Sequence, residues 1–105
     1  MTLVVRFHPL AEVDLVEAWT RYERHSRGLG DQFVSAVETA IERASRWPNA
    51  GTPVLANDVG LIIERKVAPN GFPFAIRYRL TTDLLIVMAV HHQRRRPDFG
   101  SDRAP

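Results

Sequence analysis

The sequence predicts an α+β domain: an N-terminal strand, an antiparallel two-helix hairpin and a three-stranded antiparallel meander, with the helices packed on one face of a four-stranded sheet. Two patterns indicate this class. Apolar residues recur every three or four positions through the first half of the chain and every second position from residue 61 to residue 80. These are the periods of helices and strands. A chain of 105 residues with 45% hydrophobic content suits a single domain, which we place at residues 1–99.

The first half of the chain contains the predicted hairpin. Alternation around Val4 predicts a first strand, and Pro9 suits the first turn of a helix because that position needs no backbone N–H. We expect this helix to end at His25, and Gly28 and Gly30 then permit a sharp reversal. Its apolar face comprises Ala11, Leu15, Ala18, Trp19 and Tyr22. The second helix carries an apolar stripe of Leu29, Phe33, Val37, Ala40, Ile41, Ala44 and Trp47. Trp19, Tyr22, Phe33 and Trp47 are therefore predicted to lie in the hairpin core.

The second half contains the predicted meander. The stretch that follows the second helix, up to Asp58, is rich in turn formers and is predicted to be a loop. Strands are then expected at residues 61–67 and 72–80, joined by a turn at residues 68–71. On the second of these strands one face is apolar (Phe72, Phe74, Ile76, Tyr78 and Leu80) and the other carries Ala75, Arg77 and Arg79.

The last predicted strand runs from Leu84 to about His91 and is apolar on both faces. An antiparallel strand with one face in water should show a polar side. The hairpin can cover only one face of the sheet, so we expect something else to cover part of the other.

Composition limits the chemistry that the chain can perform. Cysteine is absent, which excludes disulfides and thiolate zinc sites, and the apolar runs are too short to span a bilayer. No signal peptide is visible, so we expect a soluble cytoplasmic protein without a cofactor. Residues 1–58 carry six arginines and eight acids, whereas residues 59–105 carry eight cations and four acids. The second half is therefore the basic half, and an anionic partner is expected there.

The C-terminal residues concentrate that charge. Arg94, Arg95 and Arg96 follow the last strand directly, and Pro97 and Phe99 indicate a docked segment. Clustered guanidinium groups favour phosphates and acidic side chains, while a solvated tail is the competing interpretation. Residues 100–105 are predicted to be a flexible tail.

The histidines and helix carboxylates are weaker indications of a functional site. His91 and His92 are adjacent on a strand and point to opposite faces, so they cannot chelate one metal ion together, and we expect no metal site. We expect one ring to pack in the sheet and the other to cap the strand. The helix glutamates are spaced for ordinary surface pairs, such as Glu17 with Arg21 and Glu42 with Arg46.

Several motifs together resemble the RelE/ParE superfamily of toxins from type II toxin-antitoxin systems, over nearly the whole chain. The motifs are Ala11-Glu-Val-Asp-Leu15 with Trp19 and Tyr22, Gly28-Leu-Gly30 before Phe33, Phe72-Pro-Phe74 with Arg77-Tyr78, and the ending from Ala89 to Phe99. The RelE-type branch cleaves messenger RNA in the ribosome, and the ParE-type branch poisons DNA gyrase without nuclease chemistry. The position that matches the nuclease tyrosine is Phe99, and a third-strand arginine position aligns with Ala75. Both departures favour the ParE-like branch.

The resemblance implies a growth-arresting toxin that is neutralised by a cognate antitoxin, with DNA gyrase as its target. Target-binding residues would then be Arg77, Arg79, Arg94, Arg95, Arg96 and Phe99. In the nuclease alternative the catalytic residues would be Arg77, Arg79, His91, His92 and Arg95. A third alternative is a non-toxic module that binds only an antitoxin or nucleic acid. In each case an antitoxin segment should lie on apolar sheet or hairpin surface that the chain leaves uncovered.

Overall fold

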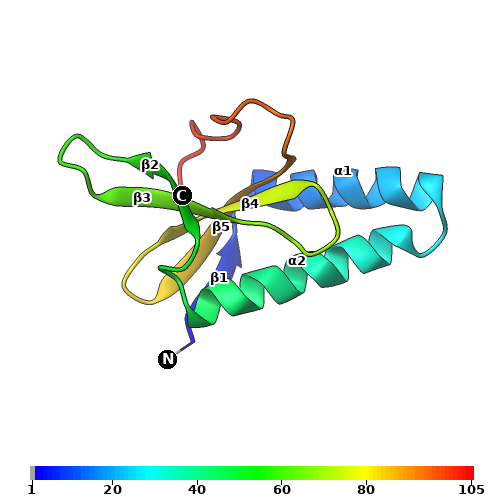
Figure 1. The fold of residues 1–105 in the computed structure, drawn as a ribbon, viewed down its shortest axis with the longest axis horizontal. Helices are drawn as coiled ribbons and strands as arrows, with labels where there is room; N and C mark the ends of the chain where they lie inside the picture. The colour runs from blue at the N-terminus through cyan, green and yellow to red at the C-terminus, as the bar shows by residue number, and fades with distance from the viewer. Residues whose placement is uncertain (1) are drawn as a thin grey trace.

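A computed structural model describes residues 2–105 and confirms the α+β class (Figure 1). The elements are β1 (Val4–Phe7), α1 (Pro9–His25), α2 (Leu29–Arg46), β2 (Thr52–Ala56), β3 (Ile62–Val67), β4 (Phe74–Leu80) and β5 (Leu84–His92). The two helices form the predicted hairpin and lie on one side of the sheet. Neither helix in residues 2–105 has the sustained apolar stretch that a membrane-spanning helix requires.

The sheet has five strands, and the prediction of four was wrong. The strand order is β1-β5-β4-β3-β2, with β1 parallel to β5 and every other pair antiparallel. The additional strand is β2, which occupies residues that we expected to form a loop. Pro53 can be accommodated because β2 is an edge strand, where one side of the backbone needs no hydrogen-bond partner. The guanidinium of Arg65 on β3 also donates to the Gly51 carbonyl at 2.9 Å, next to the start of β2.

The hairpin turn is held by one carboxylate. Glu23 accepts hydrogen bonds from the backbone N–H groups of Gly28 and Gly30 at 3.0–3.1 Å. Gly28 has φ of +86°, a conformation that costs little only for glycine. Helix α1 begins at Pro9 and ends at His25, as predicted. The buried core between the hairpin and the sheet consists of Ala11, Ala18, Phe33, Val37, Ile41, Ala44, Phe74, Ile76, Tyr78, Leu85, Val87 and Val90.

Two tryptophans depart from the predicted core. Trp47 is 60% exposed, because α2 ends one residue earlier and the backbone of Trp47 leaves the helical path. Trp19 is partly exposed and donates its indole N–H to Asp31 at 2.9 Å, which links the two helices at the surface. Tyr22 and Phe33 pack against each other as expected, with ring centroids 5.1 Å apart.

The second face of the sheet is partly covered by the end of the chain itself. Residues 93–105, which we call the C-terminal arm, follow β5 and fold back beside the sheet (Figure 1). Gly100 lies so close to β5 that an added Cβ would be 3.1 Å from the Ala89 side chain. The arm therefore explains how β5 can be apolar on both faces without exposing both to water.

Candidate macromolecule-binding site

A buried ion cluster on the second face attaches the arm to the sheet. Glu64 on β3 pairs with Arg77 and, at 3.1 Å, with Arg79, both on β4. Antiparallel pairing of β3 with β4 brings these residues together. The same Arg77 donates to two carbonyls of the arm, those of Pro97 at 2.6 Å and Phe99 at 2.8 Å. Arg77 thus holds the arm in place and is not displayed at the surface.

A second attachment joins the arm to α1 and β5. Arg103 forms a two-pronged ion pair with Asp14 on α1, at 2.7 and 3.1 Å, and donates to the Met88 carbonyl at 2.9 Å. Asp14 also accepts the Val90 N–H at 3.0 Å. Strand β1 pairs with β5 only as far as Val87, so beyond that residue backbone groups on this edge of β5 are available to side chains. We expected residues 100–105 to be flexible, and this pair holds Arg103 of that segment with only 11% of its side chain exposed.

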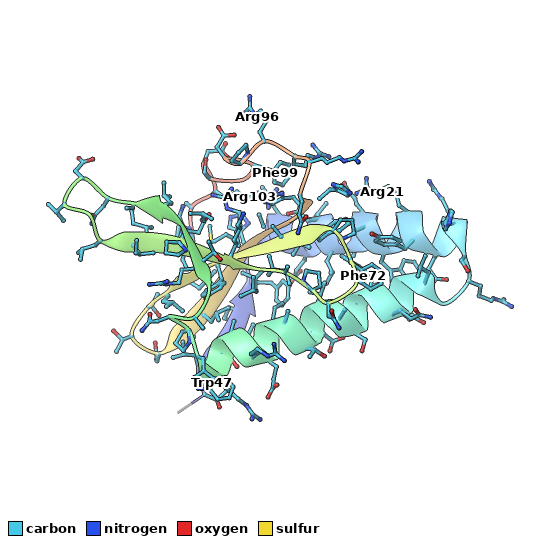
Figure 2. The ribbon with its side chains drawn as sticks, in the orientation of Figure 1. Arg21, Trp47, Phe72, Arg96, Phe99 and Arg103 are labelled. Carbon is cyan, nitrogen blue, oxygen red and sulfur yellow. The ribbon has the colours of Figure 1, made fainter. Side chains whose placement is uncertain are left out.

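Phe99 is enclosed by basic side chains. The guanidinium groups of Arg95 and Arg103 each lie 5.0 Å from the centre of its ring, and the His91 ring lies 5.3 Å away. Guanidinium groups over an aromatic face are stabilised by the ring quadrupole. Figure 2 shows Phe99 beneath the arm and Arg96 pointing away from the body of the protein. Phe99 therefore anchors the arm and also orients Arg95.

The predicted arginine run is displayed. Arg94, Arg95 and Arg96 are all exposed. Backbone hydrogen bonds fix the turns that carry them, from the Arg95 N–H to the His92 carbonyl at 2.9 Å and from the Phe99 N–H to the Arg96 carbonyl at 3.0 Å. Arg96 also lies 3.3 Å from Asp98, but both side chains are largely solvated, so the pair contributes little. Three guanidinium groups are thus presented on a defined backbone.

The two histidines point to opposite faces, as predicted. His91 is buried and donates from Nδ1 to the His92 carbonyl at 2.9 Å, which leaves Nε2 as an acceptor. That nitrogen has no hydrogen-bond partner within residues 2–105, and burial lowers the pKa of His91. His92 instead accepts the Arg94 N–H on Nδ1 at 3.0 Å and caps the strand end. Three metal-ligating side chains do not come together anywhere in the described part of the chain.

A recess of about 190 Å³ brings some of the predicted nuclease residues together. It is lined by Val54, Lys66, Ala75, Arg77, His91, Gln93, Arg95 and Pro97. Arg79 and His92, which belong to the same predicted set, do not line it. The guanidinium of Arg77 is already bound to Glu64 and the arm, so Lys66 and Arg95 are the cations through which this recess could hold a phosphate.

Sequence reasoning missed the acids that organise this region. Glu64 and Asp14 lie 13 and 89 positions from the arginines that they bind. Alternation along each strand gave the correct face for Arg77, but the identity of its partner depends on strand register. Nothing in the sequence singles out Glu64, because Glu64, Arg65 and Lys66 are three consecutive charged residues of β3.

A helical hairpin thus packs on a mixed five-stranded sheet, and a basic C-terminal arm covers part of the other face. The family described as "ParE toxin of type II toxin-antitoxin system, parDE" matches residues 5–97, and the chain belongs to that family. A solved structure described as "Chromosomal ParDE TA system from P. aeruginosa" is similar, with a TM-score of 0.69 and 12% identity over 87% of this chain and 96% of the other. At that identity the likeness shows the fold alone. No curated protein matches the sequence.

Proposed function

We propose that this ParE-family toxin inhibits DNA gyrase without nuclease chemistry and that a cognate antitoxin neutralises it. The observation that carries the proposal is that one arginine is bound within the protein while three others are exposed. Arg77 is bound to Glu64 and to arm carbonyls, whereas the arm displays Arg94, Arg95 and Arg96 to solvent. Phe99, at the position that matches the nuclease tyrosine, has no hydroxyl to move a proton.

The fixed backbone of the arm supports binding to a macromolecule. Guanidinium groups bind carboxylates and phosphates through paired N–H donors. Because turns, the Asp14–Arg103 ion pair and the hydrogen bonds from Arg77 already order the arm, binding would cost less conformational entropy than ordering a free tail. Arg77, Arg79 and Phe99 contribute to target binding by positioning the arm, with Arg79 donating to the Ser101 carbonyl at 3.4 Å. Arg94, Arg95 and Arg96 make the contacts.

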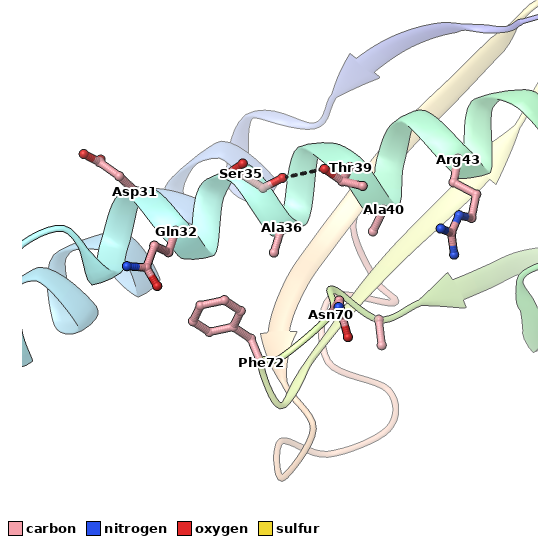
Figure 3. A pocket seen from close by; sticks show the side chains of 10 residues that line it. Asp31, Gln32, Ser35, Ala36, Thr39, Ala40, Arg43, Asn70 and Phe72 are labelled. Atoms are coloured by element: carbon pink, nitrogen blue, oxygen red, sulfur yellow. Dashed lines mark hydrogen bonds between the residues drawn. The ribbon is translucent and has the colours of Figure 1, made fainter.

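Uncovered surface on the hairpin supports an antitoxin partner. A groove of about 620 Å³ runs between α2 and the turn that precedes β4, with Gln32, Ala36 and Ala40 facing Asn70 and Phe72 (Figure 3). On α1 the side chains of Leu10, Val13 and Val16 are about half exposed or more. The exposed apolar side chains of α1 are typical of sites that bind a partner helix or strand. The groove on α2 is lined by both apolar and polar side chains, among them Asp31 and Arg43.

A supercoiling assay with purified protein tests the target. We expect inhibition and a stabilised cleavage complex at micromolar toxin. The double variant Arg94→Glu/Arg96→Glu should lose the activity, whereas Arg24→Glu/Arg27→Glu, which alters two exposed arginines at the far end of the hairpin, should retain it. Absence of inhibition by the wild-type protein would reject gyrase as the target.

One observation favours ribosome-dependent messenger RNA cleavage as a second candidate. The acceptor nitrogen of His91 is without a partner in residues 2–105, and its side chain lines the recess that contains Lys66 and Arg95. A neutral imidazole there could accept the proton of a 2′-hydroxyl. Mapping of transcript ends after induction tests this candidate: cuts that appear with the wild-type protein and vanish with His91→Ala would support it, and an unchanged pattern would remove it.

A further inference from the structure

Another pocket, of about 480 Å³ and distinct from the recess and the groove, lies where the end of α1 meets the start of β4 and the end of β5. It is lined by Arg21, Tyr22, His25, Phe74, His92 and Arg95. Four of these six side chains are basic and none is acidic. Figure 2 shows Arg21 on the side of α1 that faces the arm. The pocket is therefore complementary to an anion.

The hydrogen-bond donors of this pocket are available to a bound anion. Spacing predicted that Arg21 would pair with Glu17, but in residues 2–105 no acid lies within ion-pair distance of Arg21, whereas the analogous Glu42–Arg46 pair does form, at 2.8 Å. Glu17 and Asp14 line a small adjoining recess that shares Arg21 and Arg95 with the pocket. Asp14 is bound there by Arg103. Because Nδ1 of His92 accepts the Arg94 N–H, a neutral His92 carries its proton on Nε2 and is a donor.

The floor of the pocket is apolar, and its aromatic rings pack largely against one another. Phe74 is only 3% exposed. The centroid of its ring lies 6.0 Å from that of Tyr22 and 5.4 Å from that of His92. The ring of Tyr22 also packs against Phe33 and Phe72. Stacked nucleobases need an exposed aromatic face. Aliphatic or aromatic side chains need only apolar surface, so the floor favours a peptide over a nucleic acid.

We propose that this pocket binds an acidic segment of a protein partner, with a carboxylate between Arg21 and Arg95 and an apolar side chain against Tyr22 and Phe74. The proposal rests on the proposed function in one respect, since it takes the partner to be the antitoxin. Arg95 is also one of the three displayed arginines of the arm. The antitoxin would then neutralise the toxin by occupying a guanidinium that the target requires.

The test uses full-length toxin and the antitoxin encoded beside its gene, with binding measured by calorimetry at low and moderate salt. Arg21→Ala should raise the Kd by about 10-fold or more, the range expected when a charge-assisted hydrogen bond of about 1.5–3 kcal/mol is lost. Arg24→Ala is the matched control, because Arg24 is exposed on the same helix but does not line the pocket, and it should change the Kd by less than about 2-fold. Both arginines are exposed, so each variant should fold, and a urea unfolding midpoint checks this.

Equal Kd values for the two variants, or no binding of antitoxin by the wild-type protein, would overturn the proposal. A parallel titration with a 12-nucleotide single strand separates the other class of ligand: Arg21-dependent binding of the oligonucleotide, with antitoxin binding unchanged, would also overturn it. Arg21→Ala should inhibit gyrase like the wild-type protein when antitoxin is absent. If the wild-type protein fails to inhibit gyrase while antitoxin binding still depends on Arg21, the gyrase proposal fails and this one stands.

Discussion

Replacing Asp14 by alanine should release the end of the arm. Asp14 receives both guanidinium prongs of Arg103 and the Val90 N–H, so its loss leaves three donors without their acceptor. Only 9% of the Asp14 side chain and 11% of the Arg103 side chain are exposed. This pair is thus largely shielded from water and from salt screening.

The magnitude follows from that burial. Removing one partner of a buried pair costs about 3–5 kcal/mol because the other charge is left uncompensated. Arg103 lies outside the helices and strands, and its side chain can turn into solvent, so we expect a loss of about 2–3 kcal/mol in the free energy of unfolding. A double-mutant cycle with Arg103→Ala should give a coupling energy of about 2 kcal/mol. Glu42 and Arg46, with 57% and 55% of their side chains exposed, should couple by only about 0.3–0.5 kcal/mol.

Urea unfolding of the variants in the two double-mutant cycles measures both coupling energies in the same protein. Hydrogen exchange should in addition show lost protection at the Phe99 and Ser101 amides, which donate within the arm, in Asp14→Ala alone. If the Asp14–Arg103 coupling is no larger than that of the exposed pair, the arm is not held by this contact and its displayed arginines are not preorganised.

Three further predictions address the core, a close contact and pH. Phe33→Ala should cost about 3–5 kcal/mol in urea unfolding, whereas Trp47→Ala should stay within about 1 kcal/mol, because Phe33 is fully buried and Trp47 is largely exposed. A side chain at Gly51 would overlap the Tyr78 hydroxyl, so Gly51→Ala should destabilise by more than about 2 kcal/mol; an unchanged midpoint would contradict that packing. Burial lowers the pKa of His91, so the unfolded state binds the proton more readily and stability should fall as pH drops below about 6.5, a loss that His91→Phe should reduce in pH-dependent unfolding.

The repeat of apolar residues along the chain correctly predicted the elements that pack one side against the hydrophobic core. Helix α1 was placed correctly because Pro9 marks its start and apolar residues repeat along it. Strand β2 was missed since Thr52 and Pro53 belong to a segment rich in turn formers, and its strand conformation depends on pairing with β3. The core position predicted for Trp47 failed because the periodic stripe continued past the last helical residue. Where a helix or strand begins and ends depends on tertiary contacts, and these cannot be read from the repeat of apolar residues.

The candidate site was predicted only in part, for a physical reason. Clustering along the chain identified Arg94, Arg95 and Arg96, which are displayed as expected. Arg77 was assigned to the same surface because alternation shows which face a residue occupies but not what lies over that face. The register of β3 with β4 places Glu64 beside Arg79, and a loop of six residues between these strands leaves that register undetermined in the sequence.

Burial divides the arginines of the second half of the chain into two roles. Arg77 and Arg103 are each bound by a carboxylate and by backbone carbonyls, so they fix the arm and contribute little to the outward field. Positive charge available to a partner then comes mainly from the turns of the arm, where Arg95 borders both the recess that contains His91 and the pocket that contains Arg21. Since one guanidinium borders both cavities, an acidic segment that occupies it removes it from any other partner, and target and antitoxin would compete for Arg95 even where their remaining contacts do not overlap.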